Sequence, residues 1–280
     1  MKNPVILGLF LVWEVIIGQA LAQSTASVEI PPDNQVLRHI GHCGASSLDP
    51  DSIRVLVWNT YKGRRENWEK DYLSMIPDHQ LLLLQEAYLS PEMTKTFGAR
   101  PDLAYEMAVS FNMSSDRIPT GVATASNNCP EIIQWLRSPG RETIPGFATP
   151  KVALLTTYGL KGTAERLLVA NLHALNFVTT GTFEEQINQV LAALAQHLGP
   201  IIFAGDFNTY TQTRFDYLVA NCSKLGLIHV KFSNEKIFFG KILDHVFVRG
   251  LKVKETSIWE QIESSDHKAL DVELQLEKAN

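Results

Sequence analysis

The chain has 280 residues, and 25 lysines and arginines against 30 aspartates and glutamates give a formal net charge of −5 at pH 7. Its residues are 45% hydrophobic and 20% charged, which excludes a disordered, collagen-like or multi-span membrane protein. The acidic balance argues against a protein that coats nucleic acid with a basic surface, but not against an enzyme that binds phosphate through a metal ion. The length allows one large α/β domain or two small ones.

The first 22 residues differ in composition from the rest. Lys2 precedes an apolar run, and Ala20 and Ala22 provide the small residues of a cleavage site. This pattern predicts a secretory signal peptide at residues 1–22, cleaved near Ala22. An uncleaved anchor is the alternative, but Glu14 would then lie near mid-membrane, at a cost of about 2.5–3.5 kcal/mol. We therefore expect a secreted or periplasmic protein that keeps no stable membrane anchor.

Three cysteines, Cys43, Cys129 and Cys222, remain after this cleavage. An oxidising destination permits one disulfide with one thiol left over, and the sequence does not choose the pair. The cysteines are too few and too widely spaced for a zinc site, so we expect them to be structural.

Residues 23–50 are polar, contain Pro31-Pro32 and show no sustained period, so we expect an extended leader there. The remainder, residues 51–276, has no repeat or long linker and is expected to be one domain. Ten segments are typical of strands, and several are continuous apolar runs like those of buried strands. They are residues 53–58, 80–85, 104–111, 121–125, 152–158, 166–172, 200–204, 227–230, 245–248 and 269–274.

Two segments favour helix. Residues 66–76 are compatible with one, and residues 182–198 carry an apolar stripe at helical spacing. Thr182 with Glu185 is expected to form a capping box at the start of the second helix, and Gly199 to end it. This helix would connect the strands at 166–172 and 200–204 as a crossover.

Polar residues gather where the predicted strands end or begin. Each one, taken singly, is more typical of a turn former than of a catalytic residue. Glu86 is harder to explain that way, because an unpaired carboxylate that closes an apolar strand is costly unless a cation binds it. The six positions are Trp58-Asn59, Gln85-Glu86, Asn171-Leu172-His173, Gly205-Asp206-Phe207-Asn208, Leu243-Asp244-His245 and Ser265-Asp266-His267.

Taken together, these residues suit metal-assisted hydrolysis of a phosphoester. The set contains oxygen ligands for a metal ion, two histidines and an Asp/Asn pair. A Mg²⁺ ion held by few carboxylates would stabilise the negative charge that builds on the phosphate. A base would activate water, and an imidazolium kept charged by a carboxylate would donate to the phosphoryl oxygens.

Six motifs between residues 53 and 274 occur in a distinctive order: VLVWNTYKG, LLLLQEAYL, LLVANLHALNF, IIFAGDFNTY, LDHVFVRGL and SSDHKAL. In these motifs the chain resembles the endonuclease/exonuclease/phosphatase superfamily. That superfamily includes secreted deoxyribonucleases of the type I kind, apurinic-site endonucleases, neutral sphingomyelinases and inositol polyphosphate 5-phosphatases. Bacterial secreted members with a WN-x-x-KG first motif and an NxHxxNF third motif are the most similar.

The resemblance implies a four-layer α/β sandwich, with two mixed β-sheets packed face to face, helices outside and the site at one edge. It implies a Mg²⁺ cofactor, with Mn²⁺ as the other candidate. Glu86 would be the main metal ligand, with Asn59 beside it and Asp266 acting directly or through water.

The resemblance also implies the catalytic roles. Asp206 would align and activate the attacking water, and Asn208 would hold the phosphate and position Asp206. His267, oriented by Asp244, would stabilise the transition state, and His173 would be a candidate acid for the leaving group. The deoxyribonuclease branch pairs this second histidine with a Glu, for which Tyr105, Glu106 and Ser110 are the positions open here.

Four basic residues, Lys62, Arg64, Arg65 and Lys151, follow the first motif or precede an apolar strand. They are expected either to meet phosphates at the border of the site or to be ordinary solvated charges.

The leading hypothesis is a secreted, Mg²⁺-dependent phosphodiesterase, an endonuclease on DNA or RNA, that acts as a monomer. One alternative is a phosphatase or phospholipase on inositol phosphates or sphingomyelin, although only Phe232, Phe238 and Phe239 suggest a membrane-entering hairpin. A second alternative is a non-catalytic interaction protein, against which the complete set of site residues argues.

Overall fold

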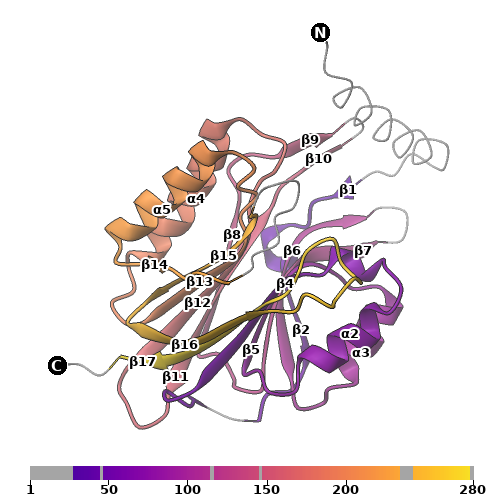
Figure 1. The fold of residues 1–280 in the computed structure, drawn as a ribbon. Helices are drawn as coiled ribbons and strands as arrows, with labels where there is room; N and C mark the ends of the chain where they lie inside the picture. Colours follow the sequence, from indigo (N-terminus) through magenta and orange to yellow (C-terminus); the bar gives the residue numbers. More distant parts are fainter. Residues whose placement is uncertain (1–27, 45–46, 114–116, 145–146, 234–241, 278–280) are drawn as a thin grey trace.

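The computed structural model describes residues 28–44, 47–113, 117–144, 147–233 and 242–277 (Figure 1). The predicted signal peptide at residues 1–22 lies outside this part of the chain, as do Phe238 and Phe239. None of the helices in the described ranges combines the length and the apolar composition that crossing a membrane requires.

The first sheet contains eight strands in the described residues, and it is mixed because β4 and β5 are parallel while its other pairs are antiparallel. Strand β2 (Leu37–Gly41) pairs with β6 beside the main path. The spatial order is β1 (Val28–Glu29), β6 (Ala104–Met113), β7 (Ile118–Ser126), β5 (Leu81–Tyr88), β4 (Ile53–Asn59), β17 (Leu270–Leu276) and β16 (Leu251–Ile258).

The second sheet contains seven strands in the same ranges and is also mixed, with β12 parallel to β13 and β11 parallel to β3. Strand β8 (Ile132–Arg137) pairs with β11, and β9 (Glu142–Ile144) pairs with β10 (Phe147–Thr149) in a separate small sheet. The spatial order is β14 (Ile228–His229), β15 (Asp244–Arg249), β13 (Ile201–Asp206), β12 (Arg166–His173), β11 (Val152–Leu160) and β3 (Ser47–Leu48).

The two sheets pack face to face, and each carries helices on its outer face (Figure 1). Successive side chains of β4 point to opposite faces of the first sheet, and both faces are apolar. Val55 and Val57 join the cluster between the sheets, whereas Leu56 and Trp58 face the helices. Helices α2 (Trp68–Met75) and α3 (Pro91–Gly98) cover the first sheet, and α4 (Thr180–Leu194) and α5 (Gln212–Lys224) cover the second. The predicted four-layer α/β sandwich is confirmed.

Each of the ten predicted strand segments overlaps an observed strand. The sequence did not predict β8, β16, the β9–β10 pair, α3 or α5. Strand β16 is an edge strand whose residues are largely exposed, so it lacks the apolar alternation that marks a half-buried strand. The described residues of the expected leader are extended apart from a 3₁₀ helix at Asp33–Gln35, and they pair with both sheets through β1, β2 and β3.

The crossover prediction is confirmed, because α4 connects the parallel neighbours β12 and β13. The predicted limits of this helix are wrong. Thr179 is the N-cap, since its backbone is extended and its side chain accepts a hydrogen bond from the Thr182 backbone N–H, so Thr182 and Glu185 form no capping box. The helix ends at Leu194, and Leu198 is 96% exposed because it lies beyond the apolar stripe.

One disulfide joins Cys43, after β2, to Cys129, after β7, while Cys222 is a buried free thiol on α5. The chain segments that the disulfide connects are 86 residues apart in sequence. The disulfide therefore ties the segment between β2 and β3 to the segment between β7 and β8.

Replacing both Cys43 and Cys129 with Ser should lower the free energy of unfolding by about 2–5 kcal/mol, because the unfolded chain loses a long closed loop. Urea unfolding followed by circular dichroism measures this change. Reductant should destabilise the wild type to the same extent and leave the double variant unchanged. An equal effect of reductant on both proteins would contradict the assignment.

Candidate active site

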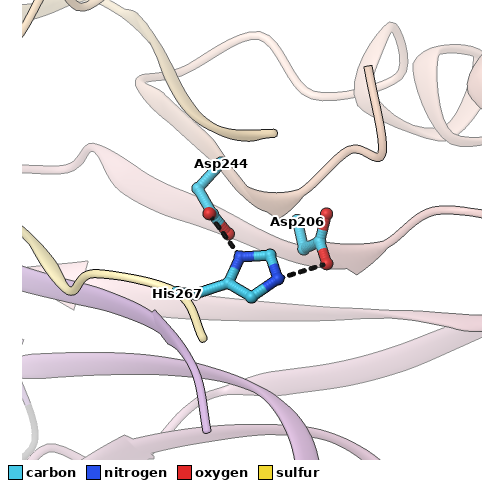
Figure 2. Close-up of side chains that lie close together, drawn as sticks. All are labelled: Asp206, Asp244 and His267. Carbon is cyan, nitrogen blue, oxygen red and sulfur yellow. Dashed lines mark hydrogen bonds and ion pairs between the residues drawn. The ribbon is translucent and has the colours of Figure 1, made fainter. Parts of the chain in front are cut away.

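Seven of the eight predicted site residues line one cavity of about 330 Å³: Asn59, Glu86, His173, Asp206, Asn208, Asp266 and His267. The eighth, Asp244, lies against the side chain of His267 (Figure 2). The cavity is located where β4, β12 and β13 end and β15 begins. The structure thus brings together all eight residues from six separate motifs.

The second sheet aligns three of these residues by strand register. His173 is paired with Asp206 across the parallel strands β12 and β13, and Asp206 is paired with Asp244 across β13 and β15. Neighbouring strands lie about 4.8 Å apart, so this pairing places the three side chains side by side. The register of the sheet therefore determines this half of the site.

Asp206 is at the centre of the polar contacts. Its Oδ2 accepts a hydrogen bond from Asn59 Nδ2 at 2.9 Å, and its Oδ1 accepts one from the Asn208 backbone N–H at 3.0 Å. His173 Nε2 is 3.5 Å from Oδ2. Burial raises the pKa of Asp206 to about 7, with Asp244 adding to the rise and His267 opposing it. A carboxylate with this pKa can accept a proton near neutral pH.

His267 bridges two carboxylates (Figure 2). Its Nδ1 is 2.6 Å from Asp244 Oδ2, and its Nε2 is 3.8 Å from Asp206 Oδ2. Burial alone would lower the pKa of His267, but the charges of Asp244 and Asp206 outweigh burial and raise it to about 10. His267 is therefore an imidazolium at neutral pH, held by Asp244 as predicted from the resemblance.

The last motif is attached directly to the first. Ser265 Oγ donates to the Asn59 carbonyl at 2.7 Å and accepts from the His267 backbone N–H at 3.1 Å. Trp58 Nε1 donates to the His267 carbonyl at 3.2 Å, and Arg65 donates to the Ser265 carbonyl at 2.7 Å. Sequence reasoning quoted Ser265 and Trp58 only as parts of motifs, and these contacts show that they position Asn59 and His267.

Glu86 is presented by an irregularity in β5. Its φ is 53°, and the pairing of β5 with β7 shifts register between Leu84 and Ala87. The Glu86 carboxylate is in contact with the ammonium group of Lys62. Burial would raise the pKa of Glu86, but the positive charges of Lys62, His173 and Lys151 hold it below its usual range. Glu86 is thus an anion that already binds a cation.

The contact between Glu86 and Lys62 bears on whether the predicted ligands suit a metal ion. Glu86 and Asp266 offer carboxylate oxygens to the cavity and Asn59 offers an amide oxygen, the donors that hard divalent cations prefer. The Lys62 ammonium is a stand-in cation on Glu86. Asn59 Oδ1 accepts a backbone N–H from Tyr61 at 3.1 Å, which fixes its amide while leaving capacity for a second interaction. The residues fit a divalent cation.

A second group, Asp206, Asp244 and His267, has ligand atoms within 4.8 Å of one another. His267 already faces a carboxylate at each ring nitrogen, with Asp244 at 2.6 Å from Nδ1 and Asp206 at 3.8 Å from Nε2. In this group the charge of His267 is thus balanced by two carboxylates, whereas the residues on the Glu86 side of the cavity could hold a metal ion.

His173 is buried, and burial lowers its pKa well below the ordinary value, reinforced by Lys151 and opposed by Glu86. Two of the three candidate partners for this histidine are bonded elsewhere. Glu106 contacts His39 at 2.7 Å, and the Tyr105 hydroxyl contacts that of Tyr72 at 2.8 Å. The carboxylate next to His173 is instead Asp206.

A buried pair of amides connects the sheets beneath the site. Gln85 Nε2 donates to Asn171 Oδ1 at 2.7 Å. Asn171 Nδ2 donates to the carbonyl groups of Ala123 at 3.0 Å and Leu84 at 3.3 Å, beside the irregularity of β5 that presents Glu86. Sequence reasoning named both amides only as motif residues, and a buried amide that ends an apolar strand was the available signal.

The basic residues divide between the two expected roles. Lys62, Arg64 and Lys151 line the cavity, whereas Arg65 donates to backbone carbonyl groups. Lys151 Nζ is 3.4 Å from a Glu142 carboxylate oxygen. The two most buried of these cavity cations, Lys62 and Lys151, thus each face a carboxylate.

Sequence reasoning missed most of the aromatic lining of this cavity. Of these residues, only Tyr61, Phe177 and Tyr210 lay within a quoted motif, and none was proposed for a role. The apolar and aromatic members of the lining are Tyr61, Phe111, Met113, Phe147, Phe177 and Tyr210.

A model of the Endonuclease/Exonuclease/phosphatase family matches residues 56–267. The chain belongs to this family. Members of the family are typically phosphoester hydrolases and generally use a divalent metal ion. The resemblance found in the sequence motifs is thereby confirmed.

The chain is also similar to curated relatives and to solved structures. The chain is 35% identical over 233 residues to a UPF0294 protein of Klebsiella pneumoniae (strain 342), covering 82% of this chain and 84% of that protein. An endonuclease/exonuclease/phosphatase from Beutenbergia cavernae superposes with a TM-score of 0.64 at 14% identity, covering 82% of this chain and 72% of the other. The human Nocturnin catalytic domain, with bound sulfate, has a TM-score of 0.59 at 19% identity over 88% and 98% of the two chains. At these identities the two solved structures show a shared fold.

Asp244→Asn should lower the pKa of His267 from about 10 toward its ordinary 6.5, because the carboxylate in contact with its Nδ1 loses its charge. A ¹⁵N NMR titration of the imidazole, in EDTA, measures this value. The contact between Asp244 and His267 stabilises the folded protein fully below pH 6.5, and this stabilisation is lost as the pH rises through about 10, the pKa of His267 in the folded state. Asp216→Asn, at an exposed position on α5, is the control; an unchanged His267 pKa in Asp244→Asn would refute the assigned contact.

Proposed function

We propose that the protein is a Mg²⁺-dependent phosphodiesterase that cleaves nucleic acid, DNA or RNA, as an endonuclease. The observation that carries this proposal is the Asp206 carboxylate, which Asn59 and Asn208 hold in place beside two histidines, 3.5 and 3.8 Å away. A fixed base next to an imidazolium in one cavity is the arrangement that water attack on a phosphoester requires.

Asp206 orients the attacking water and accepts its proton, because it is the buried carboxylate whose pKa is raised to about 7. The Asn208 backbone N–H and the Asn59 amide prevent Asp206 from rotating. Asn208 Nδ2 donates to the Ala174 carbonyl at 2.9 Å, which uses one of its two amide hydrogens and leaves the other for a phosphoryl oxygen.

His267 donates a hydrogen bond to the phosphoryl oxygens and stabilises the charge that develops on them, since Asp244 keeps it protonated. His173, on the other side of Asp206, is the candidate proton donor to the leaving oxygen. Because burial lowers its pKa, His173 would need the approaching negative charge to become protonated.

Glu86, Asn59 and Asp266 are the residues that would hold Mg²⁺, or Mn²⁺ in its place. A bound divalent ion would supply Lewis-acid stabilisation of the phosphate charge. Lys62 would leave Glu86 when the cation binds and become available to the substrate.

Two alternative functions, a phosphatase or phospholipase and a non-catalytic interaction protein, would give different results in the hydrolysis assay described below. Phe232, which suggested a membrane-entering hairpin, is 8% exposed and belongs to the core between the sheets, so sphingomyelin has less support. The complete set of polar contacts around Asp206 supports a catalytic protein over a purely binding one.

We also propose that the protein acts outside the cytoplasm, in the periplasm or medium. The apolar N-terminal segment with its small-residue cleavage pattern supports this, as does the Cys43–Cys129 disulfide, since disulfides persist in oxidising compartments.

The purified protein should hydrolyse DNA or RNA in Mg²⁺ and lose this activity in EDTA. His267→Ala and Asp206→Asn should each reduce the rate about 10²–10⁴-fold, because each removes a proton-transfer or charge-stabilising group. The panel contains supercoiled DNA, single-stranded DNA, RNA, sphingomyelin and inositol polyphosphates, with Asp216→Asn as the control. Turnover of lipid or inositol phosphate alone would move the protein to the alternative branch, and no turnover of any member would refute the proposal.

Mg²⁺ should raise the melting temperature of the wild type and should do so far less for Glu86→Gln. Saturation at about 100 times the dissociation constant would add about 2.7 kcal/mol to the stability of the wild type. Glu69→Gln, an exposed change on α2, is the matched control. Equal Mg²⁺-dependent shifts in the Glu86→Gln variant and the wild type would exclude Glu86 as a ligand.

A further inference from the structure

One wall of the active-site cavity is apolar, and we call it the aromatic wall: Phe111, Met113, Phe147 and Phe177. These side chains come from the end of β6, from β10 and from the segment between β12 and α4. None of the four belongs to the hydrophobic clusters that hold the described sheets and helices together. The fold itself therefore does not account for them.

Phe177 is the most exposed member, with 56% of its surface accessible, and the other three are partly buried. Large aromatic side chains at the rim of a polar cavity indicate a ligand surface, because burying them against a ligand contributes to binding. Asp206 and His267, where the phosphate would react, line the same cavity. The ligand should thus combine a phosphate with a flat apolar group.

Lipid is a poor match for this wall. The other large hydrophobic residues exposed in the described part of the chain do not line the cavity: Leu37, Ile132, Leu198, Ile228 and Val253. Leu198 precedes β13, whereas Asp206 ends this strand, so Leu198 lies near the end of β13 that is opposite the cavity. Entry into a bilayer needs several widely exposed apolar side chains gathered on one surface, and the other three members of the aromatic wall are only partly exposed.

A nucleic-acid duplex is also a poor match. Cations that contact phosphates supply much of the affinity for any nucleic acid, but the chain carries a net charge of −5, and Lys62 and Lys151 in the cavity each face a carboxylate, so contacts to the bases have to supply part of the affinity. The bases of a duplex are stacked on each other and cannot contact the rings. A single strand offers free base faces, and stacking on aromatic side chains binds them without sequence preference.

We propose that the aromatic wall stacks an unpaired nucleobase next to the scissile phosphate, so that single-stranded nucleic acid is the preferred substrate. This inference rests on the proposed phosphodiesterase function and specifies its substrate. A cavity of about 330 Å³ is at the small end of ligand sites, a size suited to one or two nucleotide units.

Hydrolysis is measured on three labelled oligonucleotides of one sequence: a single strand, the same strand annealed to its complement, and a single strand with abasic spacers beside the cleaved phosphate. The wild type should cleave the single strand at least about 10-fold faster than the other two, in terms of kcat/KM. Phe177→Ala should lower kcat/KM on the intact single strand by about 5- to 100-fold, the usual effect of removing one stacking ring. It should change the rate on the abasic strand less than twofold.

Phe177→Trp, which keeps a ring, should preserve the preference, and Ile132→Ala, an exposed apolar change outside the cavity, should match the wild type. Equal wild-type rates on the intact and abasic strands, or on single strand and duplex, would overturn the inference. So would a Phe177→Ala effect of the same size on all three substrates, or turnover of sphingomyelin vesicles alone.

Binding separates this inference from the proposed function. Fluorescence anisotropy of the labelled single strand is measured with Asp206→Asn and with Asp206→Asn combined with Phe177→Ala. Weaker binding on loss of the ring, without hydrolysis by the wild type, would support the stacking site and refute the phosphodiesterase. Hydrolysis by the wild type with equal binding by the two variants would refute only the stacking site.

Discussion

The hydrogen bond from Asn59 to Asp206 fixes how the two sheets meet at the active site. Asn59 ends β4 in the first sheet, Asp206 ends β13 in the second, and both side chains are buried. A buried carboxylate that loses its donor costs several kcal/mol, so any sliding of one sheet over the other is penalised. The Gln85–Asn171 amide pair adds a second contact of the same kind beneath the site.

The two sheets contribute different chemistry. The first sheet and the segment before β17 carry Asn59, Glu86, Asp266 and His267, a group that includes the carboxylate paired with Lys62 and the imidazolium. The second carries His173, Asp206 and Asp244 on adjacent strands, which supply the proton-accepting group and its neighbours. Hydrophobic packing between the sheets thus assembles a site that neither sheet contains alone.

Charge balance explains how so many ionised groups are tolerated in one buried place. Asp244 faces His267, Glu86 faces Lys62 and Glu142 faces Lys151. Asp206 differs from these pairs, because it lies between two histidines, His173 at 3.5 Å and His267 at 3.8 Å. Burial raises the pKa of Asp206 to about 7. The carboxylate whose pKa burial raises is therefore the one suited to act as a base.

The backbone carries strain in the same place. Glu86, Asn208, Tyr61 and Lys62 all have positive φ, and of the described non-glycine residues only Asn67 and Arg117 share this conformation. Such conformations cost roughly 1–3 kcal/mol each and persist only where surrounding contacts impose them. Here the contacts include the Lys62–Glu86 ion pair and the Asn208–Asp206 hydrogen bond.

The sequence by itself determined ten strand segments, the crossover helix and the polar residues at the strand ends, because buried strands and their polar ends leave local signals. The two-sheet sandwich and the roles of the site residues followed from the resemblance of six motifs to a known family. The sequence did not reveal β8 or β16, because exposed residues obscure the strand pattern there. It also did not reveal the N-cap at Thr179, because Thr182, three residues further on, is a competing candidate. Only the tertiary structure decided the Cys43–Cys129 pair, the Lys62–Glu86 contact, the partner of His173 and the aromatic wall. These depend on contacts between segments far apart in the chain, which local patterns do not encode.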